Sequence, residues 1–208
     1  MSRRGRFITF EGTEGVGKST QLVTARQALE AAGKPVLVTR EPGGTPMAEA
    51  IRELLLSTRD EAVNDLTELL LMFAARAQHL HSLILPALEQ GTWVLCDRFT
   101  DATYAYQGGG RGVPQEQIAV LEQLVQGEIR PDHVILLDAP VELGMARARS
   151  RSAPDRFERE KAAFFQRIRE SYLQRADQQP SRYHVVDAGQ PLAEVSQRVS
   201  GFISTLLA

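Results

Sequence analysis

Glycines, a lysine and a serine are spaced for phosphate binding near the start of the chain. Residues 12–19 read GTEGVGKS and fit G-x-x-x-x-G-K-[ST] at every fixed position. Glycine lets the backbone approach a phosphate, and successive N–H groups and the positive end of a following helix attract the anion. Lys18 is expected to reach the β- and γ-phosphates of a triphosphate, and Ser19 to bind Mg²⁺. The residues expected to hold the triphosphate are Gly12, Thr13, Glu14, Gly15, Val16, Gly17, Lys18, Ser19 and Thr20.

A magnesium ion in such a site also needs a carboxylate, usually at the end of another strand. Asp97 follows the apolar run 93–96 and Asp138 follows the run 133–137. Either side chain could instead cap a helix. Asp97 is favoured because Arg98 comes next, which pairs a metal-side carboxylate with a guanidinium suited to phosphate.

Arginines are concentrated once more, between residues 147 and 161. Phosphoryl transfer leaves charge on the γ-phosphate oxygens, and an arginine that closes over them can accelerate the step by roughly 10³–10⁵-fold. The stretch is therefore either a moving flap or a solvated helix end. Its arginines are Arg147, Arg149, Arg151, Arg156 and Arg159.

Short apolar runs and helical patterns alternate along the whole chain, and these elements must position the groups above. The runs lack polar alternation, which is typical of parallel strands covered on both faces. They are 7–10, 35–38, 93–96, 133–137 and 183–186. We therefore predict an α/β fold, with helices on both faces of a parallel sheet, as a single domain over residues 1–208.

Helical spacing is strongest in four segments. One follows Lys18 and stops at Gly33, and one runs from Leu66 to Leu88. A third stripe joins Phe157, Phe164, Ile168 and Tyr172, and the last covers residues 192–207.

Composition limits the class of protein. The 208 residues carry a formal net charge of −2, which argues against general nucleic-acid binding through a basic surface. The single cysteine, Cys96, excludes an internal disulfide and suits a reducing compartment. With no apolar stretch long enough for a signal peptide or a membrane span, the expectation is a cytoplasmic protein without membrane or nucleic-acid partners.

A phosphate loop alone leaves kinases, GTPases and motor ATPases open. The Asn-Lys-x-Asp motif that reads guanine is absent from the sequence. Three clusters instead have the character of an acceptor site: TREPGGT at 39–45, MFAAR at 72–76 and the segment 97–112.

With these clusters the chain resembles thymidylate kinases of the bacterial type, from about Phe7 to Asp187. The resemblance is carried by FEGTEG (10–15), TREPGG (39–44), FAAR (73–76), DRF (97–99) and YAYQG (104–108). It implies a P-loop fold of the nucleoside monophosphate kinase type, with a five-stranded core, a mobile lid at about 147–161 and generally a homodimer. The reaction implied is Mg²⁺-dependent transfer of the γ-phosphate of ATP to dTMP, which gives dTDP for dTTP biosynthesis.

The resemblance also implies roles at the acceptor phosphate and sugar. Arg98 and Arg52 grip the dTMP phosphate, Glu14 binds the deoxyribose 3′-hydroxyl, and Tyr106 closes off the sugar. By spacing alone, Glu14 could equally be a surface residue, so the family assignment decides its role. The full acceptor set is Glu14, Arg40, Glu41, Arg52, Met72, Phe73, Arg76, Arg98, Thr103, Tyr106 and Gln107.

Arg76, Gln107 and Thr103 would address the thymine edge. The family's stacking ring lies four residues before the arginine, where this chain has Met72, and Phe73 is one place later. Positions i−3 and i−4 share a helix face, so either could face the base.

Some relatives place a catalytic arginine inside the phosphate loop, where this chain has Gly15. The charge is then expected from the lid, and the catalytic set is Lys18, Arg98, Arg149, Arg151 and Arg156. Two alternatives remain: another small P-loop kinase, acting on a different monophosphate or metabolite, and a nucleotide-dependent switch.

Overall fold

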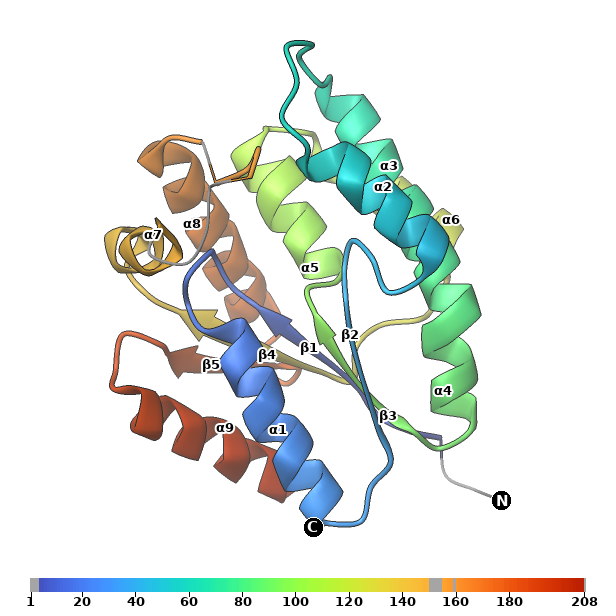
Figure 1. Cartoon of the computed structure of the whole chain (residues 1–208), viewed down its shortest axis with the longest axis vertical. Helices are drawn as coiled ribbons and strands as arrows, with labels where there is room; N and C mark the ends of the chain where they lie inside the picture. Colours follow the sequence, from blue (N-terminus) through green and yellow to red (C-terminus); the bar gives the residue numbers. More distant parts are fainter. Residues whose placement is uncertain (1–3, 150–154, 159, 208) are drawn as a thin grey trace.

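The computed structural model describes residues 4–149, 155–158 and 160–207, and these form a five-stranded, wholly parallel sheet. Its order is β2-β3-β1-β4-β5 (Figure 1). The strands are β1 (Phe7–Glu11), β2 (Val36–Arg40), β3 (Trp93–Asp97), β4 (His133–Asp138) and β5 (Tyr183–Asp187). The predicted α/β class and all five predicted strands are confirmed.

Each strand runs slightly beyond its apolar run and ends on a polar residue. The register pairs Phe10 with Asp97 and Arg40 with Asp97. Because the sheet is parallel, these polar ends lie at one edge, where crossover loops leave for the helices. The pairing of the strands therefore gathers the charged side chains.

Helices cover both faces of the sheet. Those in the described ranges are α1 (Lys18–Ala31), α2 (Pro46–Leu56), α3 (Asp65–His79), α4 (Leu85–Glu89), α5 (Thr100–Thr103), α6 (Gln115–Gln126), α7 (Val141–Arg149), α8 (Ala162–Gln178) and α9 (Leu192–Leu207). Helices α1 and α9 lie on one face, and α4, α5 and α8 on the other (Figure 1). No helix in these ranges combines the length and apolarity needed to cross a bilayer.

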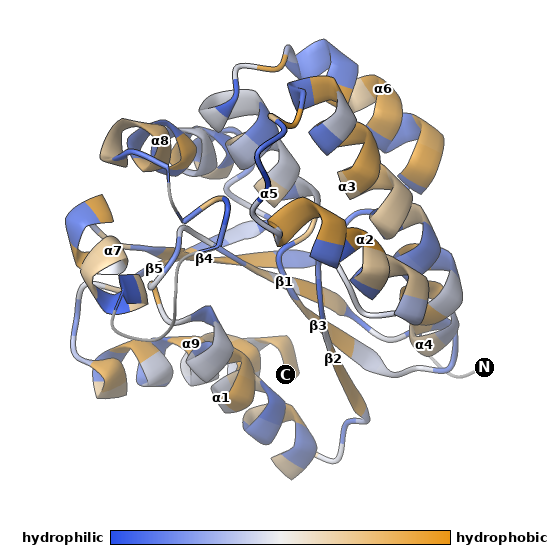
Figure 2. Ribbon diagram, turned by 45° about the horizontal axis from the view of Figure 1, so that its top comes forward, coloured by the Kyte–Doolittle hydropathy of each residue, from blue (hydrophilic) through white to orange (hydrophobic). Residues whose placement is uncertain are grey.

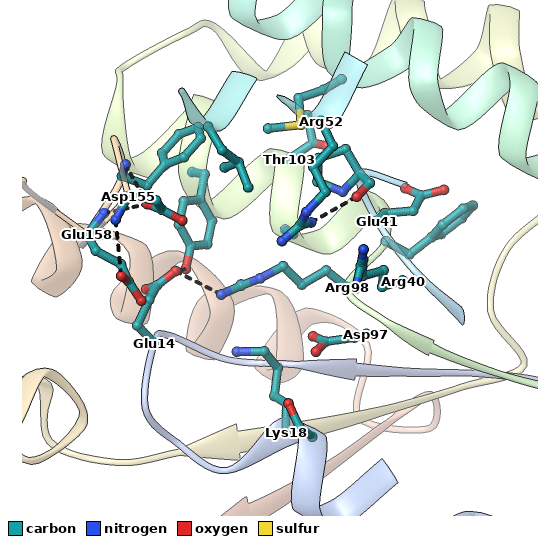
Figure 3. Close-up of a pocket in the computed structure, with 18 of the residues that line it drawn as sticks. Glu14, Lys18, Arg40, Glu41, Arg52, Asp97, Arg98, Thr103, Asp155 and Glu158 are labelled. Carbon is teal, nitrogen blue, oxygen red and sulfur yellow. Dashed lines mark hydrogen bonds and ion pairs between the residues drawn. The ribbon is translucent and has the colours of Figure 1, made fainter. Parts of the chain in front are cut away.

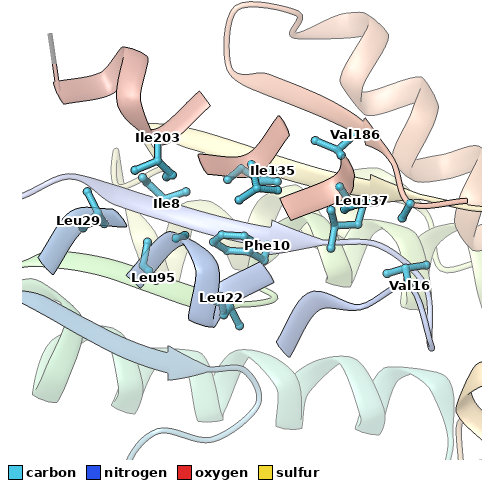
Figure 4. Packing of buried hydrophobic residues seen from close by; sticks show 14 of the residues in the cluster. Ile8, Phe10, Val16, Leu22, Leu29, Leu95, Ile135, Leu137, Val186 and Ile203 are labelled. Carbon is cyan, nitrogen blue, oxygen red and sulfur yellow. The ribbon is translucent and has the colours of Figure 1, made fainter. Parts of the chain in front are cut away.

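Alternate residues of β1 explain the two-sided core. Ile8 and Phe10 point into the cluster with α1 and α9, drawn in Figure 4, whereas Phe7 points to the opposite face. All three are fully buried. Strands β2 and β5 lie at the sheet edges and are partly exposed, so the expectation of strands covered on both faces holds best for β1, β3 and β4.

The helix predictions are largely confirmed. Helix α1 ends at Ala31, and Gly33 takes φ 71°, as a helix stop requires. The long predicted helix is α3 continued by a π-helical segment, η1 (Leu80–Ile84), into α4. A second π-helical segment, η2 (Tyr104–Gly110), follows α5. The third stripe is wrong at Phe157, which lies in a turn before α8 and is buried there by packing rather than by helical spacing.

The phosphate loop packs closely against α7. A Cβ on Gly15 would lie 1.9 Å from the carbonyl oxygen of Gly144, and Gly15 has φ +72°. A Cβ on Gly144 would lie 2.5 Å from the carbonyl oxygen of Glu14. Two glycines therefore allow backbone to meet backbone, and no arginine fits at position 15.

Replacing Gly144 with Ala should destabilise the fold by about 1–3 kcal/mol, because the added methyl overlaps the backbone of the phosphate loop. The matched control is Gly201→Ala in α9, where a Cβ meets nothing within 4 Å. That change should stabilise by about 0.5–1 kcal/mol, since glycine is a poor helix former. Urea unfolding of both variants provides the test, and a Gly144→Ala variant as stable as wild type contradicts the tight packing.

Candidate active site at the carboxyl edge of the sheet

A cleft of about 260 Å³ opens at the carboxyl edge of the sheet (Figure 3). Most of the predicted site residues line it: Glu14, Gly15, Gly17, Lys18, Ser19, Arg40, Glu41, Arg52, Met72, Arg76, Asp97, Arg98, Thr103, Tyr106 and Gln107. Asp155, Phe157 and Glu158 also line it; they fall within the segment predicted as a lid but were not predicted individually as site residues. Residues from the first, second and third strand ends, from α3 and from η2 thus meet in one cavity.

The phosphate loop presents a buried cation and an open helix end. Lys18 Nζ donates to the carbonyl oxygens of Gly12 and Thr13, at 3.1 and 2.8 Å. Burial and the nearby charge of Arg98 lower the pKa of Lys18 to about 8. Gly17 is the N-cap residue before α1, with φ 96°, and among the described residues no side chain caps that helix, so its N–H groups remain available to an anion.

Other residues of the loop are not in the cleft wall. Val16 packs in the sheet core, and Gly12 accepts hydrogen bonds from Lys18 and Arg98 through its carbonyl. Thr13 is buried and Thr20 is exposed. Any contact of these residues with a triphosphate would be made through the backbone or from outside the cleft.

Arg98 is held across the cleft by unusual backbone geometry. Its φ is 68°, in the left-handed region that a non-glycine residue rarely adopts. Its guanidinium donates to the Gly12 carbonyl at 2.9 Å and to Glu14 Oε1 at 2.9 Å, and lies 4.7 Å from the centre of the Tyr106 ring. Figure 3 shows the side chain passing above Lys18 and ending at Glu14.

Glu14 turns towards this cation rather than towards solvent. Its carboxylate also accepts a hydrogen bond from the Tyr106 hydroxyl, at 2.6 Å. The negative charge of Glu14, which is unfavourable in an anion-binding loop, is therefore neutralised by Arg98. The Glu14 carboxylate also lies beside Tyr106, the residue expected to close off the sugar.

Arg76 is buried at the far end of the cleft with one unsatisfied donor. It donates to Glu41 Oε2 at 2.7 Å and to Thr103 Oγ1 at 2.9 Å. His79 contacts the other oxygen of Glu41 at 3.0 Å. In the described part of the chain, Arg76 Nη1 is buried and has no hydrogen-bond partner. A buried N–H without a partner, in a residue that lines a cavity, points to a ligand atom as its acceptor.

Met72 and Phe73, the two residues that could face the base, lie on different sides of helix α3. Met72 lines the cleft, whereas Phe73 is buried in a separate cluster with Tyr104 and Ile118. The Phe73 ring lies 4.8 Å from the Arg76 guanidinium and so supports Arg76 from the core side. Phe73 belongs to the core, and its predicted contact with a base stays without support.

The two aspartates considered for a metal differ in their surroundings. Asp138 forms a bidentate pair with Arg169 in α8, at 2.7 and 2.8 Å. Asp97 lines the cleft together with Ser19, and its buried Oδ1 has no hydrogen-bond partner among the described residues. A hard cation prefers oxygen ligands, so the Asp97 carboxylate and the Ser19 hydroxyl fit Mg²⁺.

The arginine-rich stretch lies only partly in the described residues. Arg151 and Arg159 fall outside them, and Arg149 is the last residue of α7. Arg156 donates to the Leu55 carbonyl at 2.8 Å and to Glu68 Oε2 at 2.6 Å. In this structure Arg156 is therefore bound on the α2–α3 side and does not line the cleft.

Glu11 is a fully buried carboxylate at the end of β1, next to the phosphate loop, that sequence reasoning missed. Its oxygens accept from the Phe99 N–H at 2.7 Å and from the Tyr172 hydroxyl at 2.8 Å. Burial, followed by the charge of Asp101, raises its pKa to about 8. The signal was present: a glutamate that directly continues the apolar run 7–10 must be buried with partners.

A parallel sheet of order 2-3-1-4-5, with a phosphate loop after its central strand and a cation-lined acceptor cleft opposite, defines the P-loop nucleoside monophosphate kinase class. A model of the family described as thymidylate kinase matches residues 10–199. The chain belongs to the thymidylate kinase family. Its reaction is transfer of the γ-phosphate of ATP to dTMP, which gives dTDP and ADP.

Relatives of the same name match nearly the whole chain. A thymidylate kinase of Pseudomonas savastanoi is 59% identical over 203 residues, covering 98% of this chain and 97% of that protein. One from Alcanivorax borkumensis is 58% identical over 204 residues, covering 98% of each. The crystal structure of thymidylate kinase from Ehrlichia chaffeensis superposes with a TM-score of 0.77 at 33% identity, covering 97% of this chain and 99% of that one.

Replacing Glu11 with Gln should change how stability depends on pH. The folded pKa of about 8 lies above the ordinary value of 4.5, so the folded chain holds an extra proton between these pH values. Stability from this group is complete below the lower value and is lost as the pH rises to the upper one, by at most about 1.4 kcal/mol per unit.

Glutamine does not titrate in this range. The free energy of unfolding of wild type, minus that of Glu11→Gln, should therefore fall as the pH rises from about 5 to about 8 in urea titrations. A difference that stays constant or increases contradicts the raised pKa of Glu11.

Proposed function

We propose that the cleft holds dTMP with its phosphate between Arg98 and the phosphate loop and its base against Arg76 and Gln107. The observation that carries this is that one cavity joins Lys18 and Ser19 to the predicted acceptor residues. In-line transfer needs the donor and acceptor phosphates to meet, and a shared cavity permits that.

The acceptor phosphate would bind where guanidinium groups repel one another. Burial and the charge of Arg40, with that of Arg98, lower the pKa of Arg52. Arg52 donates to the Pro42 carbonyl at 2.8 Å, which holds it at the cleft wall. A phosphate dianion would relieve this repulsion and accept hydrogen bonds from the Arg98 fork.

The sugar and base would then lie along the wall formed by α3, α5 and η2. The Glu14 carboxylate would accept a hydrogen bond from the 3′-hydroxyl while Tyr106 covers the deoxyribose. Arg76 Nη1, buried and without a partner among the described residues, would donate to a thymine carbonyl. Met72 would contact the ring, and Thr103 would hold Arg76 in place.

On the donor side, Lys18 would bind the β- and γ-phosphates of ATP, and Ser19 and Asp97 would hold Mg²⁺. The ion would supply charge neutralisation between the donor and acceptor phosphates. The acceptor is a phosphate oxygen already ionised near neutral pH, so no strong general base is required. Positioning by Arg98 and Lys18 carries the step.

Residues 147–161 would act as a lid of the single kinase domain, with a catalytic arginine from Arg149, Arg151 or Arg156. Arg156 would have to leave Glu68 to reach the γ-phosphate. Single alanine variants that all keep the wild-type kcat would contradict this role.

The chain would work as a cytoplasmic homodimer. Apolar side chains are exposed on α3 and α6, where Leu66, Leu70, Val120 and Leu124 are 51%, 49%, 67% and 78% accessible. Figure 2 shows these two helices side by side, with hydrophobic residues along both ribbons. A second copy would cover such a patch, and sedimentation as a monomer would contradict this. A free, buried Cys96 suits a reducing compartment.

ADP release with a panel of monophosphates tests the base contacts. A site that hydrogen-bonds the thymine edge should reject dCMP by about 10⁴-fold or more in kcat/KM, whereas dUMP lacks only a methyl group and should lose about 10–200-fold. Comparable efficiency with dCMP and dTMP would contradict the roles of Arg76 and Gln107.

Asp97→Asn should lower kcat by about 10²-fold or more and raise the Mg²⁺ concentration needed for half-maximal rate, because a neutral amide is a poor ligand for a hard cation. The control is Asp138→Asn at the end of β4, where the carboxylate is paired with Arg169. Magnesium titrations of ADP release should separate the two, and equal losses would argue against a metal at Asp97.

A further inference from the structure

Glu68 is a fully buried carboxylate behind the wall of the cleft. It lies in the first turn of α3 with no exposed surface. It is not among the residues that line the cleft. A buried charge is costly unless it is paired, so its partners indicate what it does.

Three side chains converge on this carboxylate. Oε1 accepts from Gln107 Nε2 at 2.8 Å and lies 3.5 Å from Arg111 Nε. Oε2 accepts from Arg156 Nη2 at 2.6 Å. Two guanidinium groups therefore balance the charge, and the amide of Gln107 is the third donor.

The contact with Gln107 decides which way its amide faces. A carboxylate between two guanidinium groups only accepts hydrogen bonds, so Gln107 must turn its NH₂ group towards Glu68. Its carbonyl oxygen is then the amide atom left for the cleft that Gln107 lines. The side chain is 1% exposed, which leaves little freedom to rotate.

We propose that Glu68 is a specificity-determining positioning residue, which makes Gln107 present an acceptor and not a donor to the base; this rests on the proposed contact of Gln107 with thymine. Thymine and uracil carry a donor, N3–H, on the edge between their carbonyls, whereas cytosine carries an acceptor at N3. An acceptor at Gln107 therefore selects thymine over cytosine through a residue that never touches the substrate.

The surroundings of Glu68 are built without any ligand. Arg111 is paired with Glu160 and lies 4.7 Å from the Phe164 ring centre. Arg156 donates to the Leu55 carbonyl and lies 4.4 Å from the Phe157 ring centre. The guanidinium groups are thus held by other contacts, and the orientation of Gln107 is set before a nucleotide binds.

The same carboxylate contacts both Gln107 and the segment 155–158, which belongs to the arginine-rich stretch. Asp155, Phe157 and Glu158 of this segment line the cleft, and Arg156 between them is anchored on Glu68. The position of the segment and the orientation of Gln107 therefore depend on one side chain.

The test is Glu68→Gln, read as ratios of kcat/KM between substrates. Arg156, at 2.6 Å from Oε2, is the closer guanidinium and retains the new amide oxygen, so the new NH₂ takes the place of Oε1, faces Gln107 and turns the Gln107 NH₂ towards the cleft. The dTMP/dCMP ratio should fall by about 100-fold. The dTMP/dUMP ratio should stay within about twofold, because both bases carry N3–H. Ratios do not depend on how much of the enzyme is folded.

Glu122→Gln is the matched control. Glu122 is another buried carboxylate that contacts η2, where it accepts from the Tyr104 hydroxyl at 2.7 Å, and it pairs with Arg130. Its replacement should leave both ratios unchanged. If Glu68→Gln yields no active enzyme, Glu68→Asp keeps the charge but withdraws it from Gln107, and the same fall in the dTMP/dCMP ratio is expected.

The possible results distinguish the proposed contact of Gln107 with the base from the proposed positioning role of Glu68. If the wild-type enzyme does not prefer dTMP over dCMP, the proposed contact of Gln107 with the base is wrong. If wild type prefers dTMP and the Glu68 variant keeps that preference within tenfold, the positioning role is wrong. An equal fall in both ratios also overturns it, since general distortion of the cleft would then explain the loss.

Discussion

Repulsion between like charges is the constraint on which the site depends. The cleft gathers Lys18, Arg40, Arg52 and Arg98 in a space of about 260 Å³. Two of these cations are destabilised there: the pKa of Lys18 is lowered to about 8 by burial and by Arg98, and that of Arg52 is lowered by burial and by Arg40. Such an arrangement attracts anions, and two nucleotides with facing phosphates, as we propose, would neutralise it.

Carboxylates hold the cations apart and aim them. Glu14 pairs with the guanidinium of Arg98, and Glu49 pairs with Arg40 at 2.9 Å. Glu41 pairs with Arg76, and Glu68 pairs with Arg111 and Arg156. Arg98 also needs its left-handed backbone, which the Phe10 carbonyl holds by accepting the Arg98 N–H at 3.0 Å. The central strands thus supply a rigid frame, and paired acids turn a cluster of charge into an ordered site.

Thymidylate kinases are expected to supply a catalytic arginine either from the phosphate loop or from the lid, and in this fold packing excludes the first position. Gly15 approaches Gly144 of α7 so closely that no side chain fits at that loop position. The loop and α7 are packed as one surface. An arginine for the γ-phosphate would therefore have to come from outside the loop, as we propose for the lid arginines.

Much of the fold was predictable from sequence because its signals are local. Five uninterrupted apolar runs gave five strands, and Gly33 ended α1. The phosphate loop was predictable since its chemistry lies within consecutive residues. Phe157 was placed on a helix because it shares spacing with Phe164, although packing against Tyr106 and its neighbours, not periodicity, buries it.

The sequence by itself determined the class of fold, the phosphate loop and the family, because each is written in short motifs. The sequence already favoured Asp97 over Asp138, and tertiary structure added that Arg169, from a helix far along the chain, pairs with Asp138 while Asp97 lines the cleft. Tertiary structure alone placed Met72 in the cleft and Phe73 in the core, and it brought Glu11 and Glu68 to their partners. Each of these placements depends on contacts between residues distant in sequence. A local sequence pattern does not show which side chains form such contacts and which are left without a partner.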